Sequence, residues 1–359
     1  MSVDTSTTEL ALPGLELPPE PPPQPRAGER GRWIERGPSG KLMLFSGRSN
    51  PVLAGKLAEQ LNIELGDVEL KTFANGETYC RYRESIRGAD VFLVQSCFGR
   101  ATNDYLWELL SMVQAAKLAS ANRITAVVPW YPYSRQDKKS APREPISAKL
   151  LADVLEAAGV DRVLTMDLHA GQIQGFFRVP VDHMTALPLF ARYYRETLGL
   201  HGDGVVAVSP DPGRAKMANK FAQMLEADFA IMNKNRPVHD VAVVTEVIGN
   251  VSGKVAVLSD DLIVTGSTLI TGAAALKEAG ATTVYACATH GLFPDDSLQQ
   301  VAASDLAGIV VTDTVPIDEL NRPDKLTVLS VSGILAETIQ NVFSDESVSA
   351  IFAGENQLF

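Results

Sequence analysis

Short apolar runs rich in β-branched residues alternate with longer amphipathic stretches, and this alternation restricts the possible folds more than any other feature. The expected strands are KLMLFSG, DVFLVQSC, RITAVVPW, DRVLTMDL, GVVAVSPD, DFAIMN, KVAVLSDD, TTVYACAT, GIVVTDTV and LTVLSVS. The expected helices cover residues 51–61, 104–121, 146–158, 187–197, 214–225, 268–279 and 334–343. Because apolar strands alternate with helices, the sequence predicts an α/β fold with a mostly parallel sheet covered on both faces.

The alternation occurs once before about residue 187 and again after it, which indicates two similar domains in tandem. A chain of 359 residues is also too long for one ordinary core. We therefore expect domains at 41–187 and 188–359. Residues 1–40 differ, since they are rich in Ser and Thr and then in proline, and we expect a disordered tail there. A proline-rich ligand for a partner protein is the alternative.

Composition excludes several classes of function. The net charge of −11 argues against a broad nucleic-acid surface and against binding to an anionic membrane. No apolar run approaches the roughly 18 residues of a membrane helix, and the N-terminus lacks the pattern of a secretory signal. The three cysteines, Cys80, Cys97 and Cys287, are widely spaced, which favours a reduced cytoplasmic protein over a disulfide or zinc framework.

Charged residues or an imidazole occur at nearly every expected strand end. These ends read FSGRSN, PWYPYSRQD, MDLHAGQ, SPDPGR, NKNRP, SDDLIVTGST and ATHG. In parallel sheets, ligands bind where the carboxyl ends of the strands meet. A solvated loop also carries charges, so one segment alone indicates little, but the whole set predicts a polar ligand site.

The segment VAVLSDDLIVTGST, residues 255–268, joins two acids to a hydroxyl-rich turn before an expected helix. Backbone N–H groups around Gly266 and the hydroxyls of Thr265, Ser267 and Thr268 are suited to hold a phosphate. Asp260 and Asp261 are placed to accept hydrogen bonds from vicinal hydroxyls. Together these features predict a ribose 5-phosphate site; the alternative is a helix cap that follows acidic surface residues.

The segment VAVLSDDLIVTGSTL resembles the phosphoribosyl-binding loop of type I phosphoribosyltransferase folds. The segment VVPWYPYSRQDKKSAPREPISAKLLADVLEAAGVDRVLTMDLHAGQIQGFF is similar to ribose-phosphate diphosphokinase, the phosphoribosyl pyrophosphate synthetase family. The resemblance extends from FSGRSN to SVSAIF near the C-terminus. It implies two tandem phosphoribosyltransferase-like domains, the second of which carries the ribose 5-phosphate loop.

The resemblance implies that the anomeric hydroxyl of ribose 5-phosphate attacks the β-phosphorus of Mg-ATP and that AMP leaves. Lys234 and Arg236, in NKNRP after an expected strand, resemble the catalytic pair of the family's flexible loop. His169 and Asp211 match its magnesium positions. Because Mg²⁺ prefers oxygen ligands, Asp211 suits this role better than His169, which is also expected to contact ATP phosphate.

The ATP site is expected to draw on two segments. Phe73 in FANGE resembles the ring that stacks on adenine, while Arg135 and Gln136 match the family's ATP-contact pair. Asn75 stands where the family often has Asp, and an amide can still donate and accept a hydrogen bond. The residues expected to contact ATP are Phe73, Asn75, Gly76, Glu77, Arg135, Gln136 and His169.

The ribose loop departs from the family pattern Asp-Asp-x-x-Asp-Thr-Gly-Gly-Thr. Val264 replaces the third acid and Ser267 replaces the second glycine. The Val264 replacement removes a polar contact, and a hydrogen bond to a charged group contributes roughly 1.5–3 kcal/mol. We therefore expect weaker activity or weaker binding of ribose 5-phosphate, with Val264 still counted among the residues of this loop.

Three functions are compatible with these residues. The first is an active ribose-phosphate diphosphokinase. The second is a phosphoribosyltransferase that consumes its product, which would not need Phe73, Arg135, Lys234 and Arg236 together. The third is a catalytically weak subunit that regulates a synthetase, which Val264 supports.

The resemblance also implies a homo-oligomer, a dimer-based hexamer regulated by phosphate and ADP. ATP and ribose 5-phosphate are the expected small-molecule partners, with Mg²⁺ as the cofactor. Gln172, Ser347 and Ser349 lie in segments that resemble the family's regulatory anion site.

Overall fold

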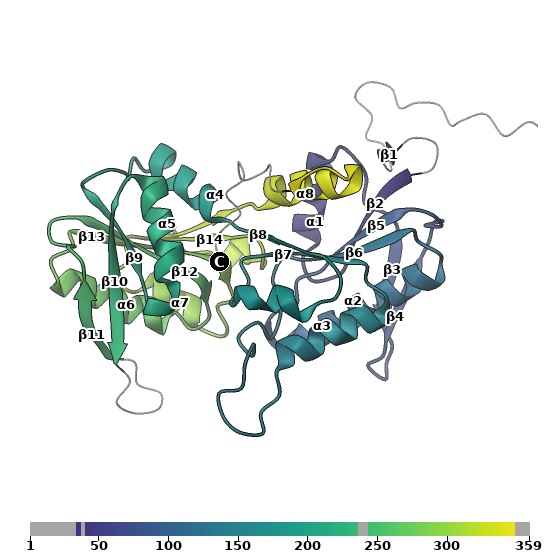
Figure 1. Ribbon diagram of the computed structural model, residues 1–359, viewed down its shortest axis with the longest axis horizontal. Helices are drawn as coiled ribbons and strands as arrows, with labels where there is room; N and C mark the ends of the chain where they lie inside the picture. Colours follow the sequence, from purple (N-terminus) through teal and green to yellow (C-terminus); the bar gives the residue numbers. More distant parts are fainter. Residues whose placement is uncertain (1–33, 37–39, 236–242, 349–359) are drawn as a thin grey trace, which may run out of the picture.

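Two open sheets lie side by side and carry the helices on their faces (Figure 1). The structure is a computed structural model that describes residues 34–36, 40–235 and 243–348. The first sheet has the order β1-β2-β5-β6-β7-β8 and the second β11-β10-β9-β12-β13-β14-β15. All pairings within these sheets are parallel except those of β1 with β2 and β11 with β10. The predicted α/β class with mostly parallel sheets is therefore confirmed.

The first sheet uses residues from the first half of the chain. Its strands are β1 (Ile34–Arg36), β2 (Gly40–Ser46), β5 (Asp90–Val94), β6 (Arg123–Val128), β7 (Arg162–Met166) and β8 (Val181–Met184). Its helices are α1 (Pro51–Gln60), α2 (Thr102–Leu118) and α3 (Ser147–Ala158). A separate antiparallel hairpin of β3 (Val68–Thr72) and β4 (Thr78–Tyr82) packs on α2. Strand β5 is fully buried because both faces of the sheet are covered, which explains why it is apolar after Asp90.

The second sheet follows the same plan. Its strands are β9 (Val205–Ser209), β10 (Asp228–Asn235), β11 (Val243–Ile248), β12 (Val255–Ile263), β13 (Thr283–Gly291), β14 (Gly308–Thr312) and β15 (Leu326–Leu329). The helices of this part are α4 (Leu187–Arg192), α5 (Ala215–Leu225), α6 (Ser267–Glu278), α7 (Ser297–Ala302) and α8 (Ser332–Ser344). No helix within the described ranges is both long enough and apolar enough to cross a membrane.

The two sheets share one hydrophobic core. It contains Phe92 from the first sheet, Val257 from the second, Leu57 from α1 and Ile339 from α8. Helix α8, the last in the chain, thus packs on α1 from the beginning of the fold, as Figure 1 also shows. The other face of each sheet has an apolar cluster of its own. Because this core is shared, the loops at the strand ends of one sheet keep a fixed position relative to those of the other.

Several expected boundaries differ from the structure. Strand β10 continues to Asn235, so Lys234 lies on a strand and not after it. Strand β12 continues through both acids to Ile263, because β13 pairs with it as far as Gly291. Several short or edge elements have no counterpart among the expected ones, namely β1, β3, β4, β8, β11 and α7. The expected disordered tail, residues 1–40, lies almost entirely outside the described residues.

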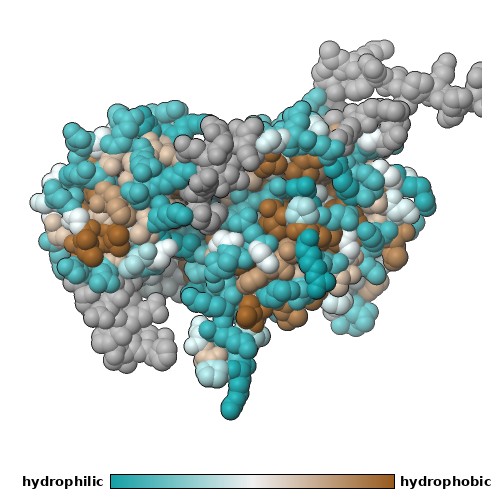
Figure 2. Space-filling view, viewed as in Figure 1, coloured by the Kyte–Doolittle hydropathy of each residue, from teal (hydrophilic) through white to brown (hydrophobic). Residues whose placement is uncertain are grey.

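The segment 129–146 between β6 and α3 is buried as far as Ser134, apart from half-buried Tyr133, and its later part extends away from the body of the molecule (Figure 1). Arg135 and Gln136 are in it, and both are exposed. Figure 2 shows that the end of this projection is hydrophilic. Tyr133 has a φ of 59°, in the left-handed region that is unusual for a bulky residue, so the segment starts from a constrained turn.

Buried His183 makes the free energy of unfolding depend on pH. This β8 residue is 4% exposed, and its Nε2 accepts a hydrogen bond from the Leu168 amide at 2.8 Å. Burial, assisted by neighbouring His290, lowers its pKa from 6.5 to about 3. Below pH 6.5 the unfolded chain therefore binds a proton that the folded chain does not, and stability decreases as pH falls. Between pH 6.5 and 5 we expect a loss of about 2 kcal/mol from this residue.

Urea denaturation at pH 7.5 and pH 5.0 measures this effect. His183→Gln keeps a hydrogen-bond acceptor and does not titrate, so it should reduce the pH dependence by about 2 kcal/mol. His201→Gln, at an exposed position, is the control and should leave the dependence unchanged. An undiminished pH dependence in the His183 variant would contradict the argument.

Candidate active site

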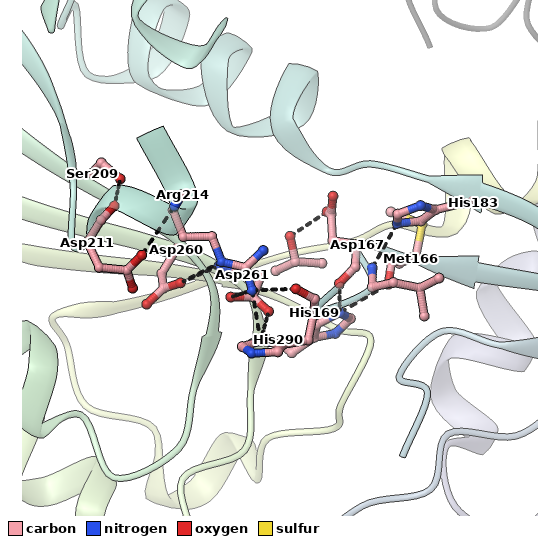
Figure 3. Close-up of polar contacts among 12 residues, drawn as sticks. Met166, Asp167, His169, His183, Ser209, Asp211, Arg214, Asp260, Asp261 and His290 are labelled. Atoms are coloured by element: carbon pink, nitrogen blue, oxygen red, sulfur yellow. Dashed lines mark hydrogen bonds and ion pairs between the residues drawn. The ribbon is translucent and has the colours of Figure 1, made fainter. Parts of the chain in front are cut away.

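The order of the second sheet reverses between β9 and β12. From β9 the chain proceeds to β10 on one side, whereas from β12 it proceeds to β13 on the other. Ligands bind at such switch points, outside the carboxyl ends of the strands. Asp211 follows β9, and Asp260 and Asp261 lie near the end of β12. His169, which follows β7 of the first sheet, projects into the same place, so both sheets build the site (Figure 3).

His169, Arg214 and Asp261 form a connected cluster at this point (Figure 3). His169 Nδ1 lies 2.8 Å from Asp261 Oδ2. Arg214 Nη2 lies 2.8 Å from Asp261 Oδ1 and 2.7 Å from the His169 carbonyl oxygen. Each carboxylate oxygen of Asp261 thus has a partner within the protein, and the residue is only 2% exposed to solvent.

The protonation of this cluster follows from its contacts. Burial raises the pKa of Asp261, but the His169 hydrogen bond and the Arg214 charge outweigh burial and lower the pKa to about 2. An ionised carboxylate only accepts hydrogen bonds, so Asp261 accepts from Arg214 Nη2 and contacts His169 Nδ1, which itself lies 2.8 Å from Arg214 Nη2. The His169 side chain is 33% exposed and lines the cavity described below, so the ring is accessible to a ligand.

Asp260 has a different environment from its neighbour. Its side chain is 16% exposed and its Oδ1 accepts a hydrogen bond from the Asp261 amide at 2.9 Å. Burial and the negative charge of Asp261 raise the pKa of Asp260 well above its usual range. Both carboxylates lie near the Arg214 guanidinium, but only Asp261 also contacts His169, and Asp260 is the more exposed of the two. The two acids are therefore not equivalent.

A buried polar network holds the residues that precede His169 in place. His290 of β13 contacts the carbonyl oxygens of Met166 and Asp167, each at 3.2 Å. Thr289 Oγ1 donates to Asp167 at 2.6 Å, and Trp130 packs against the His290 ring. Burial raises the pKa of Asp167. Since β13 and the loop after β7 belong to different sheets, this network fixes the two halves of the site relative to each other.

A cavity of about 540 Å³ opens beside the cluster. His169, Asp211 and Asp261 line it, together with a set of basic residues. The basic residues are Arg135, Lys138, Arg214 and Lys216. The structure thus gathers His169, Asp211, Asp261 and Arg135 in one cavity, as a single site for an anionic ligand requires.

Val264 lines a second cavity of about 760 Å³. Arg135 and Gln136 line it as well, along with Arg100 and Asp295. Arg135 belongs to both cavities, so the two are neighbours around one side chain. The apolar Val264 side chain therefore faces a space with charged walls.

The hydroxyl-rich turn adopts a special backbone conformation. Gly266 has a φ of 75° and precedes α6, which begins at Ser267. A Cβ atom at this position would lie 1.9 Å from Val301 Cγ2, so both the backbone and the packing require glycine. The hydroxyls of Thr265 and Ser267 are 3.2 Å apart, and both residues are exposed, whereas Thr268 is half-buried. Free backbone N–H groups at the start of α6 are available to an anion.

The FANGE segment lies far from this cluster within one chain. It forms the turn of the β3–β4 hairpin, at the opposite end of the first sheet from β12 in Figure 1. Phe73 is 45% exposed and packs edge-on against Tyr79 at 5.6 Å. Asn75 Oδ1 accepts from the Glu77 amide at 3.2 Å, and Gly76 has a φ of 90°. The structure therefore does not bring these residues to the site in one copy.

The remaining predicted residues are placed as follows. The backbone of Lys234 pairs with Val244 across the β10–β11 hairpin, beside a register shift after Asn233. Gln172 lines the first cavity and donates to Asp137 at 2.7 Å. Ser347 is exposed after α8, and among the described residues no hydrogen bond joins it to Gln172. Arg236 and Ser349 lie outside the described residues.

The donor set suits a magnesium ion that arrives with its ligand. Within the described part of the chain, no group of three or more His, Cys, Asp or Glu side chains could hold a metal ion. Mg²⁺ is often bound through one or two protein ligands while waters and substrate phosphates complete its octahedron. Asp211 supplies a carboxylate and His169 an imidazole beside the same cavity.

Sequence reasoning missed Arg214. In the sequence this arginine is only one residue of the SPDPGR strand end, whereas in the structure it contacts both His169 and Asp261. The available signal was a basic residue three positions after Asp211 at a switch-point loop. Its partners come from β12 and from the other sheet, so the contact depends on tertiary structure that spacing does not reveal.

Family models match two parts of the chain. The model of the N-terminal domain of ribose phosphate pyrophosphokinase matches residues 42–159. The model of the phosphoribosyl synthetase-associated domain matches residues 239–353.

Curated relatives cover most of the chain. It is 47% identical over 311 residues to ribose-phosphate pyrophosphokinase of Fusobacterium nucleatum, covering 87% of this chain and 98% of that one. It is 46% identical over 314 residues to ribose-phosphate pyrophosphokinase 2, chloroplastic, of Arabidopsis thaliana, covering 87% and 78%.

A solved structure, phosphoribosylpyrophosphate synthetase from Mycobacterium smegmatis, is also similar, with a TM-score of 0.79 and 44% identity. The similarity covers 85% of this chain and 99% of that one. The resemblance to phosphoribosyl pyrophosphate synthetases is thereby confirmed, and the chain belongs to the ribose-phosphate pyrophosphokinase family of enzymes.

Proposed function

We propose that this chain catalyses the transfer of the β,γ-diphosphoryl group of ATP to the anomeric hydroxyl of ribose 5-phosphate, forming phosphoribosyl pyrophosphate and AMP. The observation that carries the proposal is the junction of the two sheets. There His169, Asp211 and Asp261 line one cavity with four basic side chains, next to a glycine turn suited to phosphate. This combination provides the positioning and charge stabilisation on which phosphoryl transfer depends.

The ribose 5-phosphate site is proposed to be the end of β12 and the turn before α6. The phosphate accepts hydrogen bonds from the N–H groups and hydroxyls of residues 265–268. Asp260, the more exposed acid, accepts hydrogen bonds from the ribose hydroxyls. Asp261 orients His169 through its hydrogen bond. The sugar is thereby held with its anomeric hydroxyl toward the cavity.

ATP is proposed to enter the cavity along Arg135 and Gln136. His169 and Asp211 would hold Mg²⁺ or contact the phosphates, and the metal ion would neutralise charge on the transferred group. Lys138 and Lys216 line the same cavity and add positive charge. Lys234 and Arg236 are proposed to stabilise the migrating diphosphate, because NKNRP matches the family's catalytic loop.

A second copy is proposed to supply Phe73, Asn75, Gly76 and Glu77 to the adenine. The exposure of Phe73 and its distance from β12 within one chain support this arrangement. A dimer-based hexamer, regulation by phosphate and ADP through Gln172, Ser347 and Ser349, a cytoplasmic location and the domain boundary at 187/188 likewise stay predictions from the resemblance.

One assay tests the reaction. Purified protein is incubated with ribose 5-phosphate and Mg-ATP, and the formation of AMP and phosphoribosyl pyrophosphate is measured. Equimolar formation of both products is the expected result. The contrary outcome is a purified protein that forms no AMP by itself and yet changes the activity of an added synthetase. That result would replace the proposal by the regulatory-subunit hypothesis, which Val264 favours.

A further inference from the structure

Tyr133 stands at the start of the turn that carries Arg135. Its φ of 59° lies in the left-handed region, where the side chain of a bulky residue crowds the backbone. The amide of Gln136 donates to the Tyr133 carbonyl oxygen at 2.8 Å, so Ser134 and Arg135 are the two central residues of the turn. Such a strained conformation persists only where its surroundings hold it, and functional sites are where it is most often found.

The ring of Tyr133 is tied to a helix outside the turn. Its hydroxyl donates a hydrogen bond to Oδ1 of Asn103, which lies in the first turn of α2. The chain on either side of Tyr133 is held as well. Tyr131 donates from its hydroxyl to the Ala148 carbonyl oxygen at 3.1 Å, and Ser134 is only 1% exposed. The strained residue is thus fixed through its own side chain and through both of its flanks.

Gln136 attaches the other end of the turn to a different helix. Its carbonyl oxygen accepts from the Ala148 amide at 3.2 Å, and its Oε1 accepts from Ser147 Oγ at 2.6 Å, both in the first turn of α3. Arg135 therefore lies between a residue anchored on α2 and a residue anchored on α3. Since Arg135 lines both cavities, this pair of anchors decides where the cavities share a positive charge.

We propose that Tyr133 is a positioning residue for the nucleotide: its strained backbone, anchored through Asn103, keeps Arg135 at the place where the two cavities meet. The inference rests on the proposed function, in which ATP enters along Arg135. Because the backbone is already in place, only the side chain of Arg135 has to be ordered by the ligand, which favours binding. Without the anchor, the backbone of Tyr133 returns to an ordinary conformation and the turn moves Arg135 away.

The effect should be specific to one of the two substrates. Ribose 5-phosphate is proposed to bind at the end of β12 and at the turn before α6, and both belong to the second sheet and its helices. The turn at Tyr133 belongs to the first half of the chain. Loss of the anchor should therefore weaken the binding of ATP and leave the binding of ribose 5-phosphate nearly unchanged.

Binding of the non-hydrolysable analogue α,β-methylene-ATP to the full-length protein, measured by isothermal titration calorimetry, tests the proposal. Tyr133→Phe and Asn103→Ala each remove the anchoring hydrogen bond, and each should weaken binding by roughly three- to tenfold. Because both changes break the same contact, the double variant should lose no more affinity than either single variant. Unchanged affinity in both single variants would overturn the proposal, as would losses that multiply in the double variant.

Tyr105→Phe is the matched control. Tyr105 lies on α2 beside Phe98, and within the described ranges its hydroxyl makes no hydrogen bond. Its removal should change the affinity by less than about twofold. In steady-state assays, Tyr133→Phe should raise the KM for ATP and leave the KM for ribose 5-phosphate within about twofold of the wild type. An equal rise of both KM values would indicate a general loss of structure and would refute the positioning role.

Limited proteolysis separates this inference from the proposed function, because it requires no substrate. Trypsin cleaves after Lys138 and Lys139, which follow the turn in the exposed projection (Figure 1). The two anchor variants should be cleaved there at least about threefold faster than the wild type and Tyr105→Phe. Unchanged cleavage would refute the anchor even if the wild type forms AMP and phosphoribosyl pyrophosphate. Faster cleavage in a protein whose wild type forms no AMP would support the anchor and refute the proposed function alone.

Discussion

Replacing Asp261 by asparagine should reduce the free energy of unfolding by about 3 kcal/mol, whereas the same change at the adjacent Asp260 should cost less than about 1 kcal/mol. Asp261 is ionised, nearly closed off from solvent and paired with Arg214 and His169, so its loss leaves a largely buried guanidinium without its counter-charge. Burial and the charge of Asp261 raise the pKa of Asp260, and an amide resembles the neutral carboxyl that this environment favours.

The kinetic constants should separate the two acids as well. Asp261→Asn should lower kcat on the order of 100-fold, because the imidazole of His169 loses the partner that fixes its orientation. Asp260→Asn should mainly raise the KM for ribose 5-phosphate, since it removes acceptors from the sugar. Urea denaturation and steady-state assays of both variants check these expectations. Equal losses of stability at the two positions would show that the two acids share one environment. Such a result would contradict the closer pairing of Asp261 with His169 and Arg214.

Val264→Asp should raise turnover or the affinity for ribose 5-phosphate by roughly 10- to 100-fold. The valine stands where the family has a third acid, and a hydrogen bond to a charged group contributes roughly 1.5–3 kcal/mol. The structure adds that Val264 is half-buried and lines a cavity with Arg100 and Arg135 on its walls. A carboxylate there has basic neighbours, so its introduction should not require an unpaired buried charge.

Steady-state kinetics with varied ribose 5-phosphate measure the change, and Val264→Asn is the matched control. The amide has nearly the same size as the new acid but no charge, so it should recover only part of the gain. If neither kcat nor KM changes in the Asp variant, the valine is not what limits this enzyme, and the reason for the family's third acid lies elsewhere.

The sequence was sufficient for the elements with a strong local pattern. The buried parallel strands β5, β6, β9 and β14 were recognisable because both of their faces are covered and their residues are apolar. The hairpin β3–β4 lacks this pattern, since its residues are partly exposed and mixed in character, as are residues 246–248 of the edge strand β11. Their pairing is decided by the neighbouring strand, which no local window contains.

Three residues that line the first cavity were predictable from the sequence, but the contacts among them were not. The strand-end rule located His169, Asp211 and Asp261, which do line one cavity. The different roles of these residues were not predictable, because the pairing of Asp261 with His169 joins residues 92 positions apart. The same holds for Arg214, whose importance depends on the distance between two sheets. Spacing identifies which loops meet, whereas packing decides which atoms touch.

Helix α8 has a consequence for biosynthesis. The first sheet is complete in sequence by Met184, but one side of its core is closed by residues 332–344, which pack on α1. The first half of the chain therefore emerges from the ribosome long before the helix that covers this face is made. The face that packs on α2 and α3 can form earlier, because its cluster uses only residues of the first half, whereas the face toward α8 stays a target for chaperones until the final helix is made.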